Sequence, residues 1–141
     1  MGEVDFESTL RLSRDVSGGD FSAEFREDHV HVTIGPEYRL DPEQQEEFWE
    51  RLRAICDEHG SKRVLVEGYV PTEEMDTGEV VEAGLRTAAI PHLWMAFHLE
   101  NFVPSEGSEL FETISASRGV RVKFFSDTEH ALIWLRKNSP A

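Results

Sequence analysis

The sequence predicts an α/β fold: a mixed, mainly parallel sheet of five strands flanked by four helices, in the order ββαβαβαβα. Segment 63–67 is a short β-branched run without alternation, as expected of a central strand covered on both faces. Two alternating segments open the pattern as a hairpin, and helix-patterned segments separate all later strands. Because strands separated by helices are joined by right-handed crossovers, the strand pairs beyond the antiparallel hairpin should be largely parallel.

The hairpin is predicted to have one buried face and to lead into a long helix. Its apolar residues alternate with polar ones and are Phe21, Ala23, Phe25, Val30, Val32 and Ile34. The helix should begin with Asp41 as N-cap and Pro42 at its first position, and should end at Gly60. The spacing predicts that its inward stripe consists of Phe48, Trp49, Leu52, Ile55 and Cys56.

The rest of the chain continues as strand then helix. We expect strands over 95–99 and 120–125, with helices starting at Asp76, spanning 108–117, and following Ser126 or Asp127. Glu129 is spaced for a capping box with Ser126. The last helix should bury one stripe, made of Ala131, Leu132, Trp134 and Leu135.

The length and composition fit one domain with an additional N-terminal segment. The chain has 141 residues, of which 39% are hydrophobic, so it can bury a sizeable core. Residues 1–19 are polar, contain Ser17-Gly18-Gly19 and alternate only briefly. We interpret them as a polar arm or an extra edge strand. Residues 20–141 are then a single α/β domain.

The charge balance restricts the partners. The chain has 14 basic and 28 acidic residues, a formal charge of −14, which repels phosphate backbones and anionic lipid head groups. We therefore expect no nucleic-acid partner. The sequence has no apolar run near the roughly 20 residues that span a bilayer and no secretory signal, so we expect no membrane insertion and a cytoplasmic location. The single Cys56 rules out an internal disulfide and is expected to be a buried small hydrophobe.

One segment near the C-terminus resembles a known family. Residues 122–135 combine a strand, a short acidic turn and an Ala-Leu-x-Trp-Leu helix. With the opening hairpin, this segment resembles the bacterial STAS/SEC14-like proteins of the SpoIIAA-like superfamily, over roughly residues 20–138. The resemblance implies a SpoIIAA-like fold and a non-enzymatic regulatory or protein-interaction module. A small-molecule or lipid carrier of SEC14-like type is the alternative that it leaves open.

A second match concerns the loop after the central strand. STAS anti-sigma-factor antagonists carry Asp-Ser-Ser-Gly there, with a hydroxyl that a partner kinase phosphorylates; the corresponding residues here are Met75, Asp76, Thr77 and Gly78. The resemblance implies that Thr77 is a phosphorylation site, although Thr replaces Ser and one hydroxyl residue is missing. From the residues alone, Asp76 and Glu79 predict a capping box at a helix start, and the two interpretations can coexist.

Two loops supply the predicted binding residues. Tyr69-Val70-Pro71 and Asn101-Phe102-Val103-Pro104 both follow strands of the predicted sheet. The carboxyl ends of parallel strands meet at one edge, so both loops should lie beside the start of the helix at Asp76. The alternative is ordinary loop packing. If the edge binds a partner, we expect the contacts to come from Tyr69, Asp76, Thr77, Gly78, Asn101 and Phe102.

The other polar residues predict no site. His29 and His31 lie on one strand face, but no third metal ligand is spaced with them, so we expect a solvated face and no metal. His92 and His98 are expected to be hydrogen-bonded core residues. Glu67, Glu73, Glu74, Asp76 and Glu79 lie around one loop and are expected to be a solvated run, with a hydrolase as the less favoured alternative.

The sequence therefore predicts a protein without catalytic residues or cofactors. No nucleophile, phosphate-binding or dinucleotide-binding motif is present. The partner classes left open are another protein, a second copy of the chain as a homodimer, and a small apolar ligand.

Overall fold

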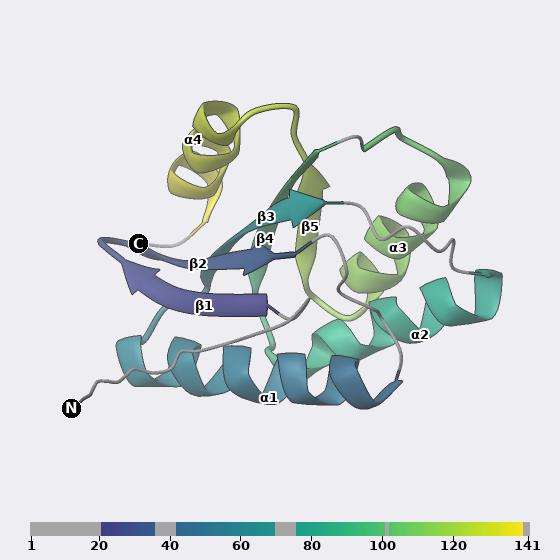
Figure 1. The fold of residues 1–141 in the computed structure, drawn as a ribbon, viewed down its shortest axis with the longest axis horizontal. Coiled ribbons are helices and arrows are strands. Elements are labelled where there is room, and N and C mark those ends of the chain that lie inside the picture. The colour runs from purple at the N-terminus through teal and green to yellow at the C-terminus, as the bar shows by residue number, and fades with distance from the viewer. Residues whose placement is uncertain (1–20, 36–41, 70–75, 101, 140–141) are drawn as a thin grey trace.

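The structure of the chain, a computed structural model, describes residues 21–35, 42–69, 76–100 and 102–139 (Figure 1). The five strands are β1 Phe21–Arg26, β2 His29–Ile34, β3 Arg63–Tyr69, β4 Trp94–Glu100 and β5 Arg121–Phe124. The helices are α1 Pro42–His59, α2 Thr77–Arg86, α3 Glu106–Ser117 and α4 Thr128–Asn138, with a short 3₁₀ turn at Thr87–Ala89. The predicted arm at residues 1–19 and the predicted cap at Asp41 lie outside the described residues.

The sheet has the predicted topology. Its strands lie in chain order, β1-β2-β3-β4-β5; β1 pairs with β2 antiparallel and the remaining three pairs are parallel. Strand β3 is central, and Val64 and Val66 are fully buried. The α/β class and the mainly parallel five-stranded sheet with four helices are therefore confirmed.

The helices divide unequally between the two faces of the sheet. Figure 1 shows α1, α2 and α3 on one side and α4 alone on the other. The larger apolar core lies on the three-helix side. It contains α1 residues of the predicted stripe and alternate strand residues, namely Phe48, Trp49, Leu52, Cys56, Val30, Val32, Val64, Val66, Met95 and Val122. Its partly buried members include Phe111 of α3.

Helix α4 covers a much smaller apolar core. Leu65 and Ala96 of the sheet are buried against Ala131 and Leu135. The prediction that Trp134 is buried is wrong: its ring is partly exposed and lies 5.4 Å from the ring of Trp94. With no second helix described beside α4, the stripe of this helix reaches the rim of the sheet, where nothing described closes over it.

The start of α4 resolves an alternative that the sequence left open. Asp127 is the N-cap, and its carboxylate accepts a hydrogen bond from the His130 backbone N–H at 2.8 Å. The cap is therefore Asp127, and the predicted capping box between Ser126 and Glu129 is wrong. Hydrogen bonds from His130 also lower the pKa of Asp127.

One glycine is required where β3 leaves the sheet. Gly68 has a φ of +149°, and a Cβ built on it would lie 2.1 Å from the backbone oxygen of Ile34 on β2. A side chain here would force the two paired strands apart. Gly60, which ends α1, has a φ of +61°, but a Cβ there would meet no atom within 4 Å.

We predict that Gly68→Ala destabilises the protein by more than about 2 kcal/mol, because backbone strain and a clash with a neighbouring strand add together. Gly60→Ala is the matched control, since it introduces left-handed strain without a clash and should cost about 1 to 2 kcal/mol. Urea denaturation of both variants measures the difference. Equal costs would show that the approach of β2 to Gly68 does not constrain the fold.

Candidate functional site

Helix α2 begins with the predicted capping box. The carboxylate of Asp76 accepts a hydrogen bond from the Glu79 backbone N–H at 2.8 Å, and the Asp76 N–H donates to the Glu79 carboxylate at 2.9 Å. Thr77 occupies the first helical position, and Thr77 and Gly78 are both exposed. The hydroxyl-bearing residue therefore lies at the accessible, electropositive end of a helix.

Two exposed hydrophobic side chains lie at the carboxyl edge of the sheet. Tyr69 is the last residue of β3, pairs with Glu100 of β4 and is 44% exposed. Val103, three residues beyond the end of β4, is 75% exposed. Only one other large hydrophobic residue of the described ranges, Ile133 on α4, is classed as exposed.

Phe102 does not lie free at this edge. Its ring stacks on the ring of Phe124 at 4.5 Å with an interplanar angle of 3°, and its backbone N–H donates to Leu99 O at 3.3 Å. For Phe102, loop packing therefore fits the structure better than a side chain that is free to contact a partner. Val103 takes the exposed position instead. The other predicted residue of this loop, Asn101, lies outside the described residues.

The starts of α2 and α3 lie side by side at the same edge. A Cβ built on Gly107, in the first turn of α3, would come within 3.9 Å of Val80 Cγ2 on α2. Ser105 caps α3 by accepting from the Ser108 N–H at 3.2 Å. The described residues of this edge include four exposed acidic ones, Asp76, Glu79, Glu100 and Glu106. The edge therefore combines apolar side chains with negative charge.

A polar cluster that the sequence did not predict lies on the α4 side of the sheet. Glu67 of β3 accepts hydrogen bonds from His31 Nε2 at 2.7 Å and from His98 Nδ1 at 2.9 Å. The Thr128 hydroxyl also donates to Glu67. Partial burial acts to raise the pKa of Glu67, but hydrogen bonds from His31, His98 and Thr128 outweigh it and lower the pKa to about 2.

The geometry of this cluster suits an anchor better than a proton relay. An ionised carboxylate only accepts hydrogen bonds, so both imidazole nitrogens that face Glu67 carry a proton. A hydroxyl–imidazole–carboxylate relay uses two different nitrogens of the imidazole. Here Thr128 Oγ1, at 3.2 Å, and Glu67 approach the same nitrogen of His98. Glu67 therefore joins β2, β3, β4 and the start of α4 without activating Thr128.

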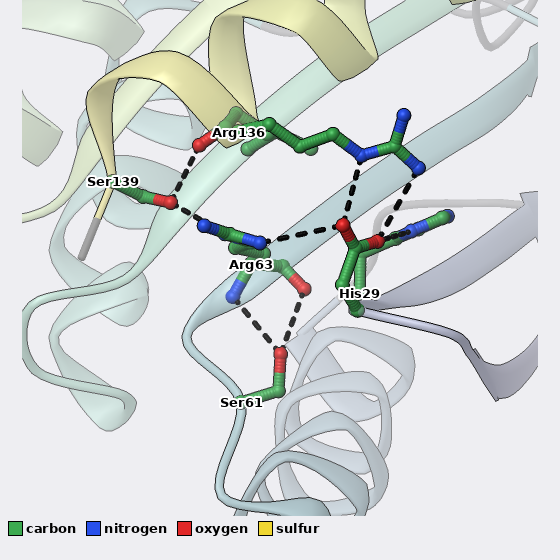
Figure 2. Close-up of polar contacts among 7 residues, drawn as sticks. His29, Ser61, Arg63, Arg136 and Ser139 are labelled. Atoms are coloured by element: carbon green, nitrogen blue, oxygen red, sulfur yellow. Dashed lines mark hydrogen bonds and ion pairs between the residues drawn. The ribbon is translucent and has the colours of Figure 1, made fainter. Parts of the chain in front are cut away.

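A second polar cluster, shown in Figure 2, holds the end of α4. Asp28 accepts hydrogen bonds from Arg136 Nε at 2.8 Å and from His29 Nδ1 at 3.0 Å, and these lower the pKa of Asp28 to about 2. Arg63 lies 3.4 Å from the same carboxylate and donates to the Ser139 hydroxyl at 2.6 Å. Both ends of α4 are therefore tied to the sheet by polar contacts.

The predicted solvated face at His29 and His31 is wrong. The two side chains are buried, with residue exposures of 6% and 8%, and both take part in the polar clusters. The reason is that Glu67 of β3 and the Asp28 cluster, which includes Arg136 of α4, pack against this face of β2. His98 is hydrogen-bonded, as predicted, but is only partly buried. His92 is exposed, so the prediction that it is a core residue is wrong.

The predicted acidic run does not form one cluster among its described members. Glu67 contacts Thr128 at the start of α4, whereas Asp76 and Glu79 bond to each other's backbone at the start of α2. Glu73 and Glu74 lie outside the described residues. Cys56 is buried as predicted, and burial raises the pKa of its thiol to about 11, so it is an inert core residue.

No protein-family model matches the chain, and neither the curated proteins nor the solved structures contain a significant match. Within the described ranges, no group of three His, Cys, Asp or Glu side chains is arranged to hold a metal ion. The described helices include none with the length and apolar character needed to cross a membrane.

We predict that Asp76→Ala costs about 0.5 to 2 kcal/mol of folding stability, whereas Asp76→Asn costs little, because an amide oxygen can still accept from the Glu79 N–H. Thermal or urea denaturation of the two variants tests this. A loss of stability for Asp76→Asn as large as that for Asp76→Ala would show that charge at this position matters more than capping.

We predict that Glu67→Gln costs about 1 to 3 kcal/mol at neutral pH, because an ionised acceptor of three hydrogen bonds is replaced by a neutral amide. The folded-state pKa of Glu67 is lowered from 4.5 to about 2. The contribution of Glu67 to folding stability is therefore fully present above pH 4.5, the unfolded-state pKa, and is lost as the pH falls from 4.5 towards about 2.

Urea denaturation at a series of pH values from 7 down to 3 separates the contribution of Glu67 to stability from that of the other titrating groups. The stability of the wild type should fall more steeply than that of Glu67→Gln, which retains the separate contribution of Asp28. Glu50→Gln, on the exposed face of α1, is the matched control and should change stability by less than about 0.5 kcal/mol. Parallel pH profiles for the wild type and Glu67→Gln would contradict the anchoring role.

Proposed function

We propose that this chain is a non-enzymatic regulatory module of STAS type, with a SpoIIAA-like fold, that binds a protein partner through the carboxyl edge of its sheet. The observation that carries the proposal is the exposure of Tyr69 and Val103 at this edge. Large apolar and aromatic side chains in such positions are the usual anchors of protein interfaces. The ββαβαβαβα order and the mixed sheet support the family assignment.

The charge around these anchors indicates the character of the partner surface. Asp76, Glu79, Glu100 and Glu106 are exposed at the edge, in a chain whose formal charge is −14. A partner with basic residues around an apolar centre would be attracted over about a Debye length, whereas an acidic surface would be repelled. The proposed partner therefore presents an apolar contact surrounded by Lys and Arg.

Thr77 is the proposed point of regulation. It is exposed at the first position of α2, where a phosphate would lie near the free backbone amides of the first helical turn. The added negative charge would also change the field at the binding edge. Phosphorylation of Thr77 would thus alter partner binding with little effect on the core.

The non-enzymatic character is supported by the chemistry of the Glu67 cluster. With a pKa of about 2, Glu67 is a poor proton acceptor at neutral pH, and Thr128 directs its hydroxyl to Glu67. Asp76 and Glu79 are already engaged with backbone groups. These described carboxylates therefore favour a structural role over acid–base catalysis.

Affinity capture from the source organism, with quantitative mass spectrometry, tests this function. We expect at least one protein to be enriched by the wild-type chain and to bind the Tyr69→Ser/Val103→Ser variant more than tenfold more weakly, a loss of about 1.4 kcal/mol. Ile133→Ser is the matched control, because Ile133 is 51% exposed but lies on α4. For the captured protein, Thr77→Glu should change affinity by a similar factor without lowering the melting temperature.

Identical capture by the wild type, the edge variant and the control would contradict the proposal. Native mass spectrometry of the purified chain distinguishes the carrier alternative. A small apolar molecule that stays bound through purification, with no captured protein, would favour the carrier.

A further inference from the structure

Strand β5 presents an open backbone edge in the described part of the chain. It is the last strand of the sheet and pairs with β4. The N–H groups of Arg121 and Phe125 donate to carbonyls of the β4 side, Leu93 O at 2.9 Å and Phe97 O at 2.7 Å. Successive residues of a strand direct these groups to opposite sides. The backbone groups of Val122 and Phe124 therefore point away from the sheet.

Positive charge is concentrated at this edge of an acidic protein. Residues 1–112 contain 9 basic and 26 acidic residues, whereas residues 113–141 contain 5 basic and 2 acidic residues. Arg118, Arg121 and Lys123 are exposed, and none of them forms an ion pair with a described carboxylate. Burial raises the pKa of Glu112 on α3, and the positive charge of Lys123 opposes this rise without a direct ion pair between the two side chains. The β5 edge thus has unpaired positive charge.

An aromatic surface continues the edge. Arg121, Lys123 and Phe125 are alternate residues and lie on the α4 side, where the Lys123 ammonium is 5.7 Å from the centre of the Phe125 ring. The Phe125 ring is 5.5 Å from that of Trp134, and both are partly exposed. A strand laid along β5 would meet two positive charges and then an apolar surface.

We propose that the β5 edge binds an extended acidic segment of a partner protein, which adds to the sheet as a further strand. Outward N–H and C=O groups at Val122 and Phe124 would pair with the backbone of the segment. Acidic side chains at alternate positions would contact Arg121 and Lys123. This surface is separate from the carboxyl edge and requires the opposite charge in its partner.

The same charges decide which strands pair with β5. Two copies of the chain that met through β5 would bring Arg121 and Lys123 of each copy together, and like charges directly opposite each other destabilise a strand pair. A basic segment would be repelled in the same way. An acidic segment with apolar residues between its carboxylates satisfies both the charge and the alternation of β5.

A synthetic peptide tests the proposal with the full chain. The probe is a fluorescein-labelled heptapeptide, Glu-Val-Glu-Val-Glu-Val-Glu, and fluorescence anisotropy measures its binding. We expect saturable binding that weakens at least tenfold for Arg121→Glu/Lys123→Glu. The control Lys62→Glu/Lys137→Glu changes the net charge equally at exposed positions away from β5 and should stay within twofold of the wild type. Circular dichroism checks that both variants fold.

Backbone pairing is tested by changing the peptide, so that the result does not depend on whether a protein variant folds. Two further peptides carry N-methyl groups either on all Glu or on all Val residues, which removes alternate N–H donors and keeps the charge. One of the two should bind at least tenfold more weakly than the parent peptide. The proposal is overturned if neither is weakened, if the control variant loses as much affinity as the β5 variant, or if the wild type shows no saturable binding up to about 1 mM.

Discussion

The packing of α4 on the sheet depends on the hydrogen bonds that the carboxylate of Glu67 accepts. Glu67 lies on the central strand and accepts hydrogen bonds from β2, from β4 and from the first residue of α4. A partly buried charge is tolerated only while such donors surround it, because burial alone would favour its neutral form. One side chain thus links three neighbouring strands and places the start of the last helix over them.

The polar contacts determine the position of α4 because its apolar core is small. Among the described residues, four buried side chains form that core, whereas fifteen form the core on the opposite side of the sheet. Contacts at Glu67 hold the start of the helix, and contacts at Asp28 and Arg63 hold its end. With α4 fixed over β3 and β4, β5 and the partly exposed Phe125 and Trp134 remain accessible at the rim.

The fold was predictable from the sequence wherever a structural feature depends on residues that are close together in the chain. The β-branched run at 63–67 correctly predicted a strand that is covered on both faces. The spacing of Asp76 and Glu79 correctly predicted the start of a helix. The partial exposure of Trp134 was not predictable, because helical spacing does not show whether a neighbouring element covers the apolar stripe. The stacking of Phe102 was not predictable for a similar reason: Phe102 lies in the loop after β4, whereas its stacking partner, Phe124, lies on β5.

By itself, the sequence determined the element order, the parallel pairing of the later strands and the excess of negative charge, because each follows from neighbouring residues or from a count. The tertiary structure alone decided that His31, Glu67, His98 and Thr128 form one cluster. These residues are separated along the chain by about thirty positions or more, and no short-range pattern encodes their contact. They meet because parallel crossovers bring β2, β3 and β4 side by side, and because α4 begins directly above that point of the sheet.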